Sequence, residues 1–538
     1  MDFCTFNNRI TLPKMKKYIF ILLLFSINFA FAQFPNILIS TSNQPEEVAI
    51  AINPKNTNQI VAGSNIKNAY RSVDGGVTWI NQTLSCTAYD VWGDPVMIWD
   101  TANACYYIHL SNPNAAITPS GTWVDRIVVQ KSGNFGQTYT TCVGIGKNGT
   151  KVQDKAWAVI NPYNNDMHIT WTQFDDYGSA NILDSSIILY SKSNDGGNTF
   201  TIPKRISKFA GNCVDADSTV EGAVPAIGPL GEIYVGWAGQ NGLMFQKSTD
   251  GGTTWLANEQ FVNAFPGGWD YAISGLSRCN GLPFTFCDLA NASPYKGNIY
   301  MNWSDKANGL NDGDVWITKS INGGTTWSAP FRVNDDVPGK QQFMSAMTID
   351  QVTGYIYILF YDRRNYASGN NTDVYLAVSQ NGGASFSNHK VNANSFSPNS
   401  NYFFGDYIGI SAHNNVIRPI WMQMTNAGAL SVYTALVNPL ALGIDEKKEA
   451  NLNFISASPN PFKIETSIEF SLLKQEKLTI QLVDNVGRII KELETKKSFV
   501  NGKNKILINA SDYNLKPGIY FVAFYGDEKS KFTKIVLE

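Results

Sequence analysis

The stretch Ser72 to Trp79 reads SVDGGVTW, and phrases of the same kind recur five more times along the chain. The third positions of successive phrases are separated by 60, 61, 55, 72 and 59 residues. A near-constant period of this size is typical of a repeat architecture. Each phrase has the composition of a tight β-turn, with an Asp or Asn that bonds its own backbone and glycines that accept positive φ. The other phrases are SGNFGQTY (Ser132 to Tyr139), SNDGGNTF (Ser193 to Phe200), STDGGTTW (Ser248 to Trp255), SINGGTTW (Ser320 to Trp327) and SQNGGASF (Ser379 to Phe386).

These phrases resemble the Asp-box, or BNR repeat, of the sialidase-like β-propellers. In that family the box joins the two outer strands of a blade, on the face away from the active site. The resemblance implies an all-β propeller fold. It says nothing of chemistry, because the same box occurs in hydrolases, lectin-like binders and assembly factors.

The number of blades follows from the strand pairs that precede the boxes. Six pairs of short alternating strands accompany the six boxes, and a seventh pair, Asp406 to His413 with Val416 to Met424, has no box. The N-terminal segment Ile37 to Thr41 is the candidate for the missing outer strand, beside Leu430 to Val437. Closure by strands from both ends leaves no open sheet edge. We therefore predict seven blades, with six, the number in true sialidases, as the alternative.

The first residues have the order of a secretory signal peptide. A lysine pair is followed by the apolar run Tyr18 to Phe25 and by the small-residue motif Ala30 to Ala32. We predict a signal peptide at residues 1–32, with Met15 as the true start and a buried N-terminal element as the alternative. The run is too short for a membrane span, and no other stretch approaches roughly 18 apolar residues. The mature protein is therefore expected to have no transmembrane segment.

The C-terminal residues 454–538 alternate with period two after the phrase SPNPF at Ser458 to Phe462. They also contain DNVGR, LKPGIYFV and the basic, apolar tail KFTKIVLE. This combination closely resembles the type A C-terminal sorting domain of the type IX secretion system. The resemblance implies a small β-sandwich that engages the secretion machinery, and a secreted or outer cell-surface location. A sandwich that binds some other ligand is the alternative.

These assignments divide the chain into a signal peptide, a propeller at 33–440, a linker at 441–453 and the sorting domain at 454–538. The linker is charged and lacks periodicity. A formal net charge of -2 excludes the basic surface expected of a nucleic-acid-binding protein.

Cysteine usage agrees with an exported protein, because six cysteines lie outside the predicted signal peptide. Cys279 and Cys287 bracket a short loop with Gly and Pro, and we predict a disulfide between them. Cys86 with Cys105 is a second pairing, while the remaining two cysteines are open to being free buried thiols. The four histidines are scattered and no C-x-x-C occurs, which argues against a structural zinc site.

Acidic residues recur where a propeller carries its usual site. On that face the inner strand of each blade starts and the second strand ends. Carboxylates that converge there would raise some of their own pKa values unless cations intervene. The alternative is that each acid caps its own blade. The acids at inner strands are Glu47, Asp94, Asp154, Glu221, Asp288 and Asp406, those at second strands are Asp175, Asp176, Asp305 and Asp362, and the basic partners are Lys155, Arg278, Arg363 and Arg364.

Five residues of this face are the catalytic candidates. We expect the acids among them to converge with Arg363 or Arg364 on one concave surface near the axis. Such carboxylates suit the acid and the nucleophile or base of a glycoside hydrolase or lyase. They would also suit calcium, the candidate cation, whereas no other cofactor is predicted. The catalytic candidates are Asp154, Glu221, Asp362, Asp406 and Tyr407.

The longest insertion between blades, residues 258–287, is a candidate carbohydrate platform. Aromatic faces stack on sugars while charged groups fix hydroxyls, and Tyr271 and Phe286 would extend the aromatic set. A loop that only packs over the ring is the alternative. The predicted substrate-binding residues are Trp269, Asp270 and Arg278 from the insertion, with Tyr361, Arg363 and Arg364 from the sixth blade.

Resemblance to sialidases implies a Tyr nucleophile with a Glu partner, an Asp acid and three arginines that grip the substrate carboxylate. The chain departs from this pattern, because no Arg-Ile-Pro phrase occurs near the first blade and the arginines do not fall on three separate second strands. We therefore expect weak or absent sialidase activity. The sequence predicts a secreted or surface propeller that binds or cleaves extracellular glycans or glycoproteins. The alternative is a non-catalytic adhesion or protein-interaction propeller.

Overall fold

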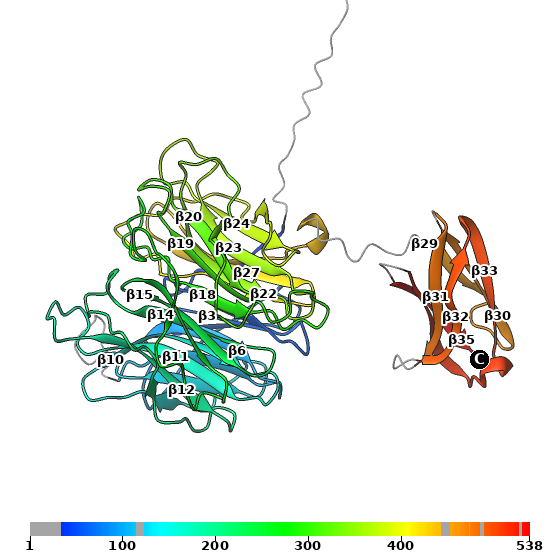
Figure 1. Cartoon of the computed structure of the whole chain (residues 1–538), viewed down its shortest axis with the longest axis horizontal. Coiled ribbons are helices and arrows are strands. Elements are labelled where there is room, and N and C mark those ends of the chain that lie inside the picture. The colour runs from blue at the N-terminus through cyan, green and yellow to red at the C-terminus, as the bar shows by residue number, and fades with distance from the viewer. Residues whose placement is uncertain (1–33, 114–122, 443–451, 473, 485–488, 527–529) are drawn as a thin grey trace, which may run out of the picture.

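The computed structural model describes residues 34–113, 123–442, 452–472, 474–484, 489–526 and 530–538 (Figure 1). The predicted signal peptide and most of the predicted linker lie outside these residues. Two β-rich units are described, one before and one after the linker. Within the described ranges no helix is long and apolar enough to cross a membrane.

The first unit is a propeller of seven four-stranded antiparallel sheets, counted over the described residues. The first strands of neighbouring blades contact one another around the ring, including β26 with β2, so these strands are the innermost. Blades 1 to 3 contain β2 (Ala49–Ile52), β3 (Ile60–Ser64), β4 (Asn68–Ser72), β5 (Ile80–Thr83); β6 (Gly93–Trp99), β7 (Cys105–Leu110), β8 (Ile127–Ser132), β9 (Val143–Ile145); and β10 (Val152–Ile160), β11 (Met167–Phe174), β12 (Ser186–Ser193), β13 (Lys204–Arg205).

The remaining blades repeat this order, and the last one joins both ends of the propeller. Blades 4 to 6 contain β14 (Glu221–Ile227), β15 (Ile233–Gly239), β16 (Gly242–Ser248), β17 (Gln260–Asn263); β18 (Phe284–Cys287), β19 (Ile299–Asp305), β20 (Asp314–Ser320), β21 (Phe331–Arg332); and β22 (Gln342–Ile349), β23 (Ile356–Asp362), β24 (Asp373–Ser379), β25 (Ser387–Lys390). Blade 7 contains β26 (Gly409–His413), β27 (Val416–Met424), β28 (Leu430–Ala435) and β1 (Asn36–Ser40).

Closure of the ring agrees with the sequence-based expectation. Strand β1 pairs antiparallel with β28, and Ile37 lies opposite Thr434. The prediction of seven blades, closed by the N-terminal strand, is confirmed, and the six-blade alternative is wrong. A 3-10 turn, Pro439–Leu442, follows the last blade.

The boxes form the turns between the third and fourth strands of blades 1 to 6. In the first box, the Asp74 carboxylate accepts hydrogen bonds from the backbone and hydroxyl of Thr78, at 2.9 and 2.6 Å. The Ser72 hydroxyl accepts the Gly76 N–H at 2.8 Å, where φ is +92°. Hydrogen bonds from Thr199 likewise lower the pKa of Asp195 to about 2. The boxes are thus structural, as the Asp-box resemblance implies.

The second unit is a sandwich of two antiparallel sheets. One sheet contains β29 (Leu452–Ser458), β30 (Glu465–Leu472) and β33 (Gly502–Asn509), and the other contains β31 (Glu476–Asp484), β32 (Ile489–Phe499), β34 (Gly518–Tyr525) and β35 (Ser530–Leu537). A short 3-10 turn, Ser511–Tyr513, lies between β33 and β34. Phe470 packs against Phe499 and Phe524 in the core, with ring centroids 5.2 and 4.9 Å apart. This unit buries its own core, which favours an independent domain.

The predicted disulfide between Cys279 and Cys287 is wrong, because both thiols are free. The two cysteines pack into different hydrophobic clusters. Cys279 belongs to the cluster that contains Tyr271, whereas Cys287 ends β18 and packs with Ile299. Proximity in sequence therefore does not bring the two sulfur atoms together. Cys86 and Cys105 are free as well.

Candidate functional site

Five of the seven inner strands have a residue with left-handed backbone geometry at or near their start. The angle φ is 50° at Glu47, 52° at Asp94, 45° at Lys155, 72° at Gly222 and 48° at Met344. In four of these blades the pairing with the second strand shifts at the same point, which marks a β-bulge. Non-glycine residues rarely adopt this geometry, and bulges often re-aim side chains beside a site. The repeated bulge therefore singles out this end of the axis.

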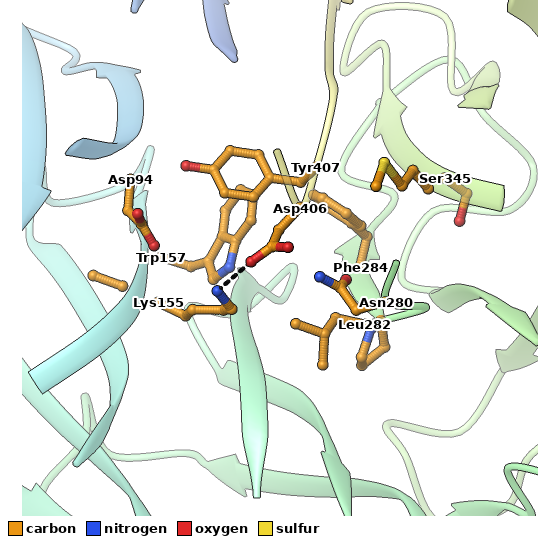
Figure 2. A pocket seen from close by; sticks show the side chains of 12 residues that line it. Asp94, Lys155, Trp157, Asn280, Leu282, Phe284, Ser345, Asp406 and Tyr407 are labelled. Atoms are coloured by element: carbon orange, nitrogen blue, oxygen red, sulfur yellow. Dashed lines mark hydrogen bonds and ion pairs between the residues drawn. The ribbon is translucent and has the colours of Figure 1, made fainter. Parts of the chain in front are cut away.

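A network of buried and partly exposed charges occupies this end of the axis. Lys155 of blade 3 donates from Nζ to Asp406 of blade 7 at 2.8 Å (Figure 2). Arg278 of the insertion donates from Nε to the same carboxylate at 2.8 Å, and from Nη1 to Asp215 at 3.3 Å. Tyr177 donates its hydroxyl to Asp215 at 2.5 Å. The network thus joins blades 3 and 7 to the insertion.

The buried carboxyl groups near the axis fall into two groups, one with a lowered pKa and one with raised pKa values. Although burial opposes it, Lys155 and Arg278 hold the pKa of Asp406 well below its usual range. Burial raises the pKa of Asp154 to about 7, and burial together with Asp215 raises the pKa of Glu221. Burial and the neighbouring Asp94 raise the pKa of Glu47. Asp406 is therefore a charged anchor, whereas the other three acids keep their protons to a higher pH than usual.

The free space beside this network is small. The cavity has a volume of about 20 Å³ and is lined by Lys155, Asp406 and Tyr407, and by Asn280 and Leu282 of the insertion (Figure 2). A space of this size holds about one water molecule. A sugar ring therefore does not fit into the cavity beside the charge network.

The insertion is held over the mouth by hydrogen bonds to its backbone as well as by Arg278. Arg363 donates to the Ser274 carbonyl at 2.8 Å, and Lys306 donates to the Ala272 carbonyl at 2.5 Å. These contacts give the insertion a packing role, which is the alternative that the sequence left open.

The predicted catalytic residues gather only in part. Asp154, Glu221 and Asp406 surround Lys155, and Tyr407 lines the same cavity. Asp362 lies apart from this group, because it accepts hydrogen bonds from Gln342 at 3.1 Å and from Arg364 at 2.7 Å within blade 6. The expectation that Asp362 and Arg363 or Arg364 join the axial acids is wrong, and Lys155 and Arg278 take the place of those arginines.

The predicted substrate-binding residues are mostly committed to structural contacts. The Tyr361 hydroxyl donates to the Met422 carbonyl at 2.9 Å and is fully buried. Arg364 stacks over the Tyr375 ring at 4.3 Å. The Asp270 carboxyl is partly buried, and burial and Asp217 raise its pKa. Trp269 is 3% exposed and donates to the Thr219 carbonyl at 3.4 Å. The aromatic faces of the insertion therefore do not form an open platform.

Trp269 nevertheless forms part of the wall of a hollow beside the insertion. This hollow has a volume of about 350 Å³ and lies against the hairpin between β15 and β16. Its volume falls within the range of small-molecule sites, about 300–1,000 Å³. Gln240 and Asn241 at the hairpin are exposed. The walls are formed by Asp217, Gly239 to Gly242, Ala264 to Pro266, Gly268 and Trp269.

The cation prediction has no support from the geometry. Within the described residues, no group of three or more His, Cys, Asp or Glu side chains is arranged to hold a metal ion. At the axis, the Lys155 ammonium and the Arg278 guanidinium lie among the carboxylates instead. Calcium binding stays a prediction.

Sequence reasoning did not find Asp215 and Tyr177, which complete the axial network. Both residues lie in loops between strands, where no periodic pattern marks a position. The signal that was present is the acidic pair Asp215 and Asp217, just before the inner strand that opens at Glu221.

Comparison with known proteins identifies the second unit. Residues 456–538 match the family described as "Secretion system C-terminal sorting domain". The chain therefore carries a sorting domain that marks proteins for secretion or for the cell surface. No curated protein matches the chain.

Solved structures similar to the chain are propeller proteins. They include the Hadza microbial sialidase Hz136, with 10% identity over 70% of this chain and 73% of that chain and a TM-score of 0.42. A polysaccharide lyase, the ulvan lyase PL25, has 13% identity over 75% and 94% and a TM-score of 0.42. The α-L-arabinofuranosidase arb93a from Fusarium graminearum has 13% identity over 61% and 92% and a TM-score of 0.41.

Proposed function

We propose that this chain is a secreted or cell-surface propeller that binds extracellular glycans without cleaving them. The observation that carries the proposal is the contrast between the cavity of about 20 Å³ beside the charge network and the hollow of about 350 Å³ beside the insertion. The acids suited to glycosidic chemistry are buried behind the insertion, where no sugar ring reaches them. The larger hollow offers the amides of Gln240 and Asn241. Such amides donate hydrogen bonds to sugar hydroxyls and also accept hydrogen bonds from them.

The test is a glycan array with the purified full-length protein, followed by mass spectrometry of each bound glycan after incubation. We expect binding and unchanged glycan masses. We also expect the double variant Gln240→Ala with Asn241→Ala to reduce that binding. Release of a product that is lost in Glu221→Gln would show that the axial acids are catalytic, and binding to no glycan at all would refute the proposal.

A protein partner is the second candidate, because an apolar patch lies on a different pair of loops. Ile182 and Leu183 are 94% and 83% exposed, and Phe209 is 56% exposed. Their loops are joined where the Gly178 N–H donates to the Cys213 carbonyl at 2.7 Å. Exposed apolar side chains that cluster in this way favour protein contacts. Loss of cell adhesion in Ile182→Ser with Leu183→Ser, with glycan binding unchanged, would support this candidate.

A further inference from the structure

A second hollow, of about 420 Å³, lies between blades 6 and 7. Its walls come from the segment before β24, the segment after β25 and the adjacent strands β27 and β28. No charged side chain is among the described residues that line it. The lining residues are Asn371, Ser395 to Ser397, Gln423 to Asn426, Ser431 and Tyr433.

One wall is part of blade 7, where strand pairing sets the positions of the side chains. Gln423 lies opposite Ser431, and Trp421 lies opposite Tyr433. Residues paired in this way, two positions apart on each strand, share one face of the sheet. The Trp421 ring is fully buried and stacks on Tyr433 with centroids 6.1 Å apart and planes at 19°. The buried tryptophan therefore fixes the orientation of the half-exposed tyrosine.

The opposite wall is held in place by blade 6. The backbone of Phe396 exchanges two hydrogen bonds with Thr372, at 2.7 and 3.1 Å. The Phe396 ring packs against Tyr361 and Phe404, with centroids 5.7 Å away in each case. The Ser397 hydroxyl donates to the Asn371 side-chain oxygen at 2.5 Å. The wall is therefore preorganised, which lowers the cost of binding a ligand.

The chemistry of these walls selects the class of ligand. Amides and hydroxyls donate and accept hydrogen bonds, as sugar hydroxyls do. A carboxylate or sulfate would lose its hydration without gaining a cation, which is unfavourable. Resting on the proposed glycan-binding function, we infer that this hollow is a separate subsite for an uncharged sugar unit. The sugar ring lies against Tyr433, and its hydroxyls meet Gln423 and Asn371.

The experiment compares variants of the full-length protein by isothermal titration with a neutral oligosaccharide selected on the glycan array. We expect Tyr433→Ala to weaken binding about tenfold, whereas Tyr433→Phe, which keeps the ring, changes it less than about threefold. Tyr163→Ala is the matched control, because Tyr163 is a 54% exposed tyrosine on blade 3. Melting temperatures of all variants check that the fold is retained.

The outcomes separate this inference from the proposed function. If the parent binds glycans and Tyr433→Ala and Gln423→Ala bind equally well, the subsite inference is wrong and the function stands. Equal affinity for the matching sialylated or uronic acid oligosaccharide would also overturn it, because the hollow has no cation. If the parent binds no glycan, the proposed function is wrong, and the subsite inference that rests on it is wrong as well.

An independent observation concerns two cysteines in blades 1 and 2. Cys86 is buried, and Cys142 packs against the same cluster, which includes Val91 and Cys105. Burial and the neighbouring Cys86 thiol raise the pKa of Cys142 to about 12. The loop after β5 runs beside β9, since a Cβ added to Gly144 would lie 3.0 Å from the Tyr89 ring. The two cysteines therefore pack in one cluster, on neighbouring segments.

Cys86 and Cys142 are free thiols in this structure, and we propose that they form a disulfide in the exported protein and so link blade 1 to blade 2. A protein or small-molecule disulfide of the export route is the oxidant. Its sulfur–sulfur bond is reduced to two thiols, while the two cysteine thiols lose their protons and form one new bond. The linked segments then cannot separate at this blade boundary.

Peptide mapping of the secreted protein without reductant tests this proposal. We expect a peptide pair joined through Cys86 and Cys142, with the other four of the six described cysteines open to alkylation after denaturation. Cys142→Ser should abolish the joined pair, and Cys213→Ser should leave it intact. Full alkylation of both cysteines in the secreted parent, or a Cys86 to Cys105 link, would overturn it.

Discussion

The axial network and the hollow between blades 6 and 7 are built from the same kinds of strand ends and loops, but they differ in charge and space. In the axial network, Lys155, Arg278 and several acids lie around a cavity of about 20 Å³. The hollow has a volume of about 420 Å³ and is lined by amides, hydroxyls and Tyr433, with no charged side chain among the described lining residues. A cluster of acids alone is therefore a poor guide to a binding site. Here the charges join distant blades, and the neutral surface is open to a ligand.

The largest effect should come from breaking the charge network at its anchor. Asp406→Ala leaves the buried Lys155 and the partly exposed Arg278 without their shared carboxylate. Removing one partner of a buried pair such as Lys155 and Asp406 typically costs about 3–5 kcal/mol. We expect a corresponding fall in the free energy of unfolding, measured by denaturant titration. The control is Asp335→Ala, because the Asp335 side chain is 55% exposed and its pair with Arg364 should contribute less than about 1 kcal/mol. Similar losses in both variants would show that the network is not an anchor.

A smaller effect should appear in the pH dependence of stability. The pKa of Asp154 is raised from 3.8 to about 7, chiefly by burial, so folding favours its protonated form. Its contribution to stability is present below its unfolded pKa and is lost as the pH rises through about 7. We expect the melting temperature of the parent to fall from about pH 5 to about pH 8, and to fall less in Asp154→Asn. Parallel curves for the two proteins would contradict a protonated Asp154.

The same pH series sharpens the comparison at the neutral hollow. No Asp, Glu, His, Lys, Arg or Cys side chain lines that hollow among the described residues. Affinity for a neutral oligosaccharide should therefore change less than about twofold between about pH 5 and pH 8, provided that the protein stays folded. A steep change in affinity that Asp154→Asn removes would couple the two regions and contradict their separation.

The smallest expected effect is that of calcium. Because Lys155 and Arg278 already neutralise Asp406, we expect equal melting temperatures in calcium and in a chelator. A ligand that binds only the folded state would raise the melting temperature with concentration. Such a rise, lost in Glu221→Gln, would restore calcium as a ligand of the axial acids.

The sequence by itself determined the architecture, because local rules carry it. The boxes require glycines and an Asp or Asn at fixed positions, the strands alternate with period two, and the count of strand pairs gave seven blades with Ile37 to Thr41 as the closing strand. The sorting domain was also evident, since its motifs lie within one short segment, residues 454–538.

Only the tertiary structure decided which polar residues meet. Asp406 and Lys155 lie 251 positions apart and form one ion pair, whereas Asp362 pairs with Arg364 in its own blade. Cys279 and Cys287 are close in sequence and pack into different clusters. The hollow at Tyr433 requires blades 6 and 7 to pack side by side. These contacts depend on the spatial arrangement of blades and loops, which no local pattern of residues encodes.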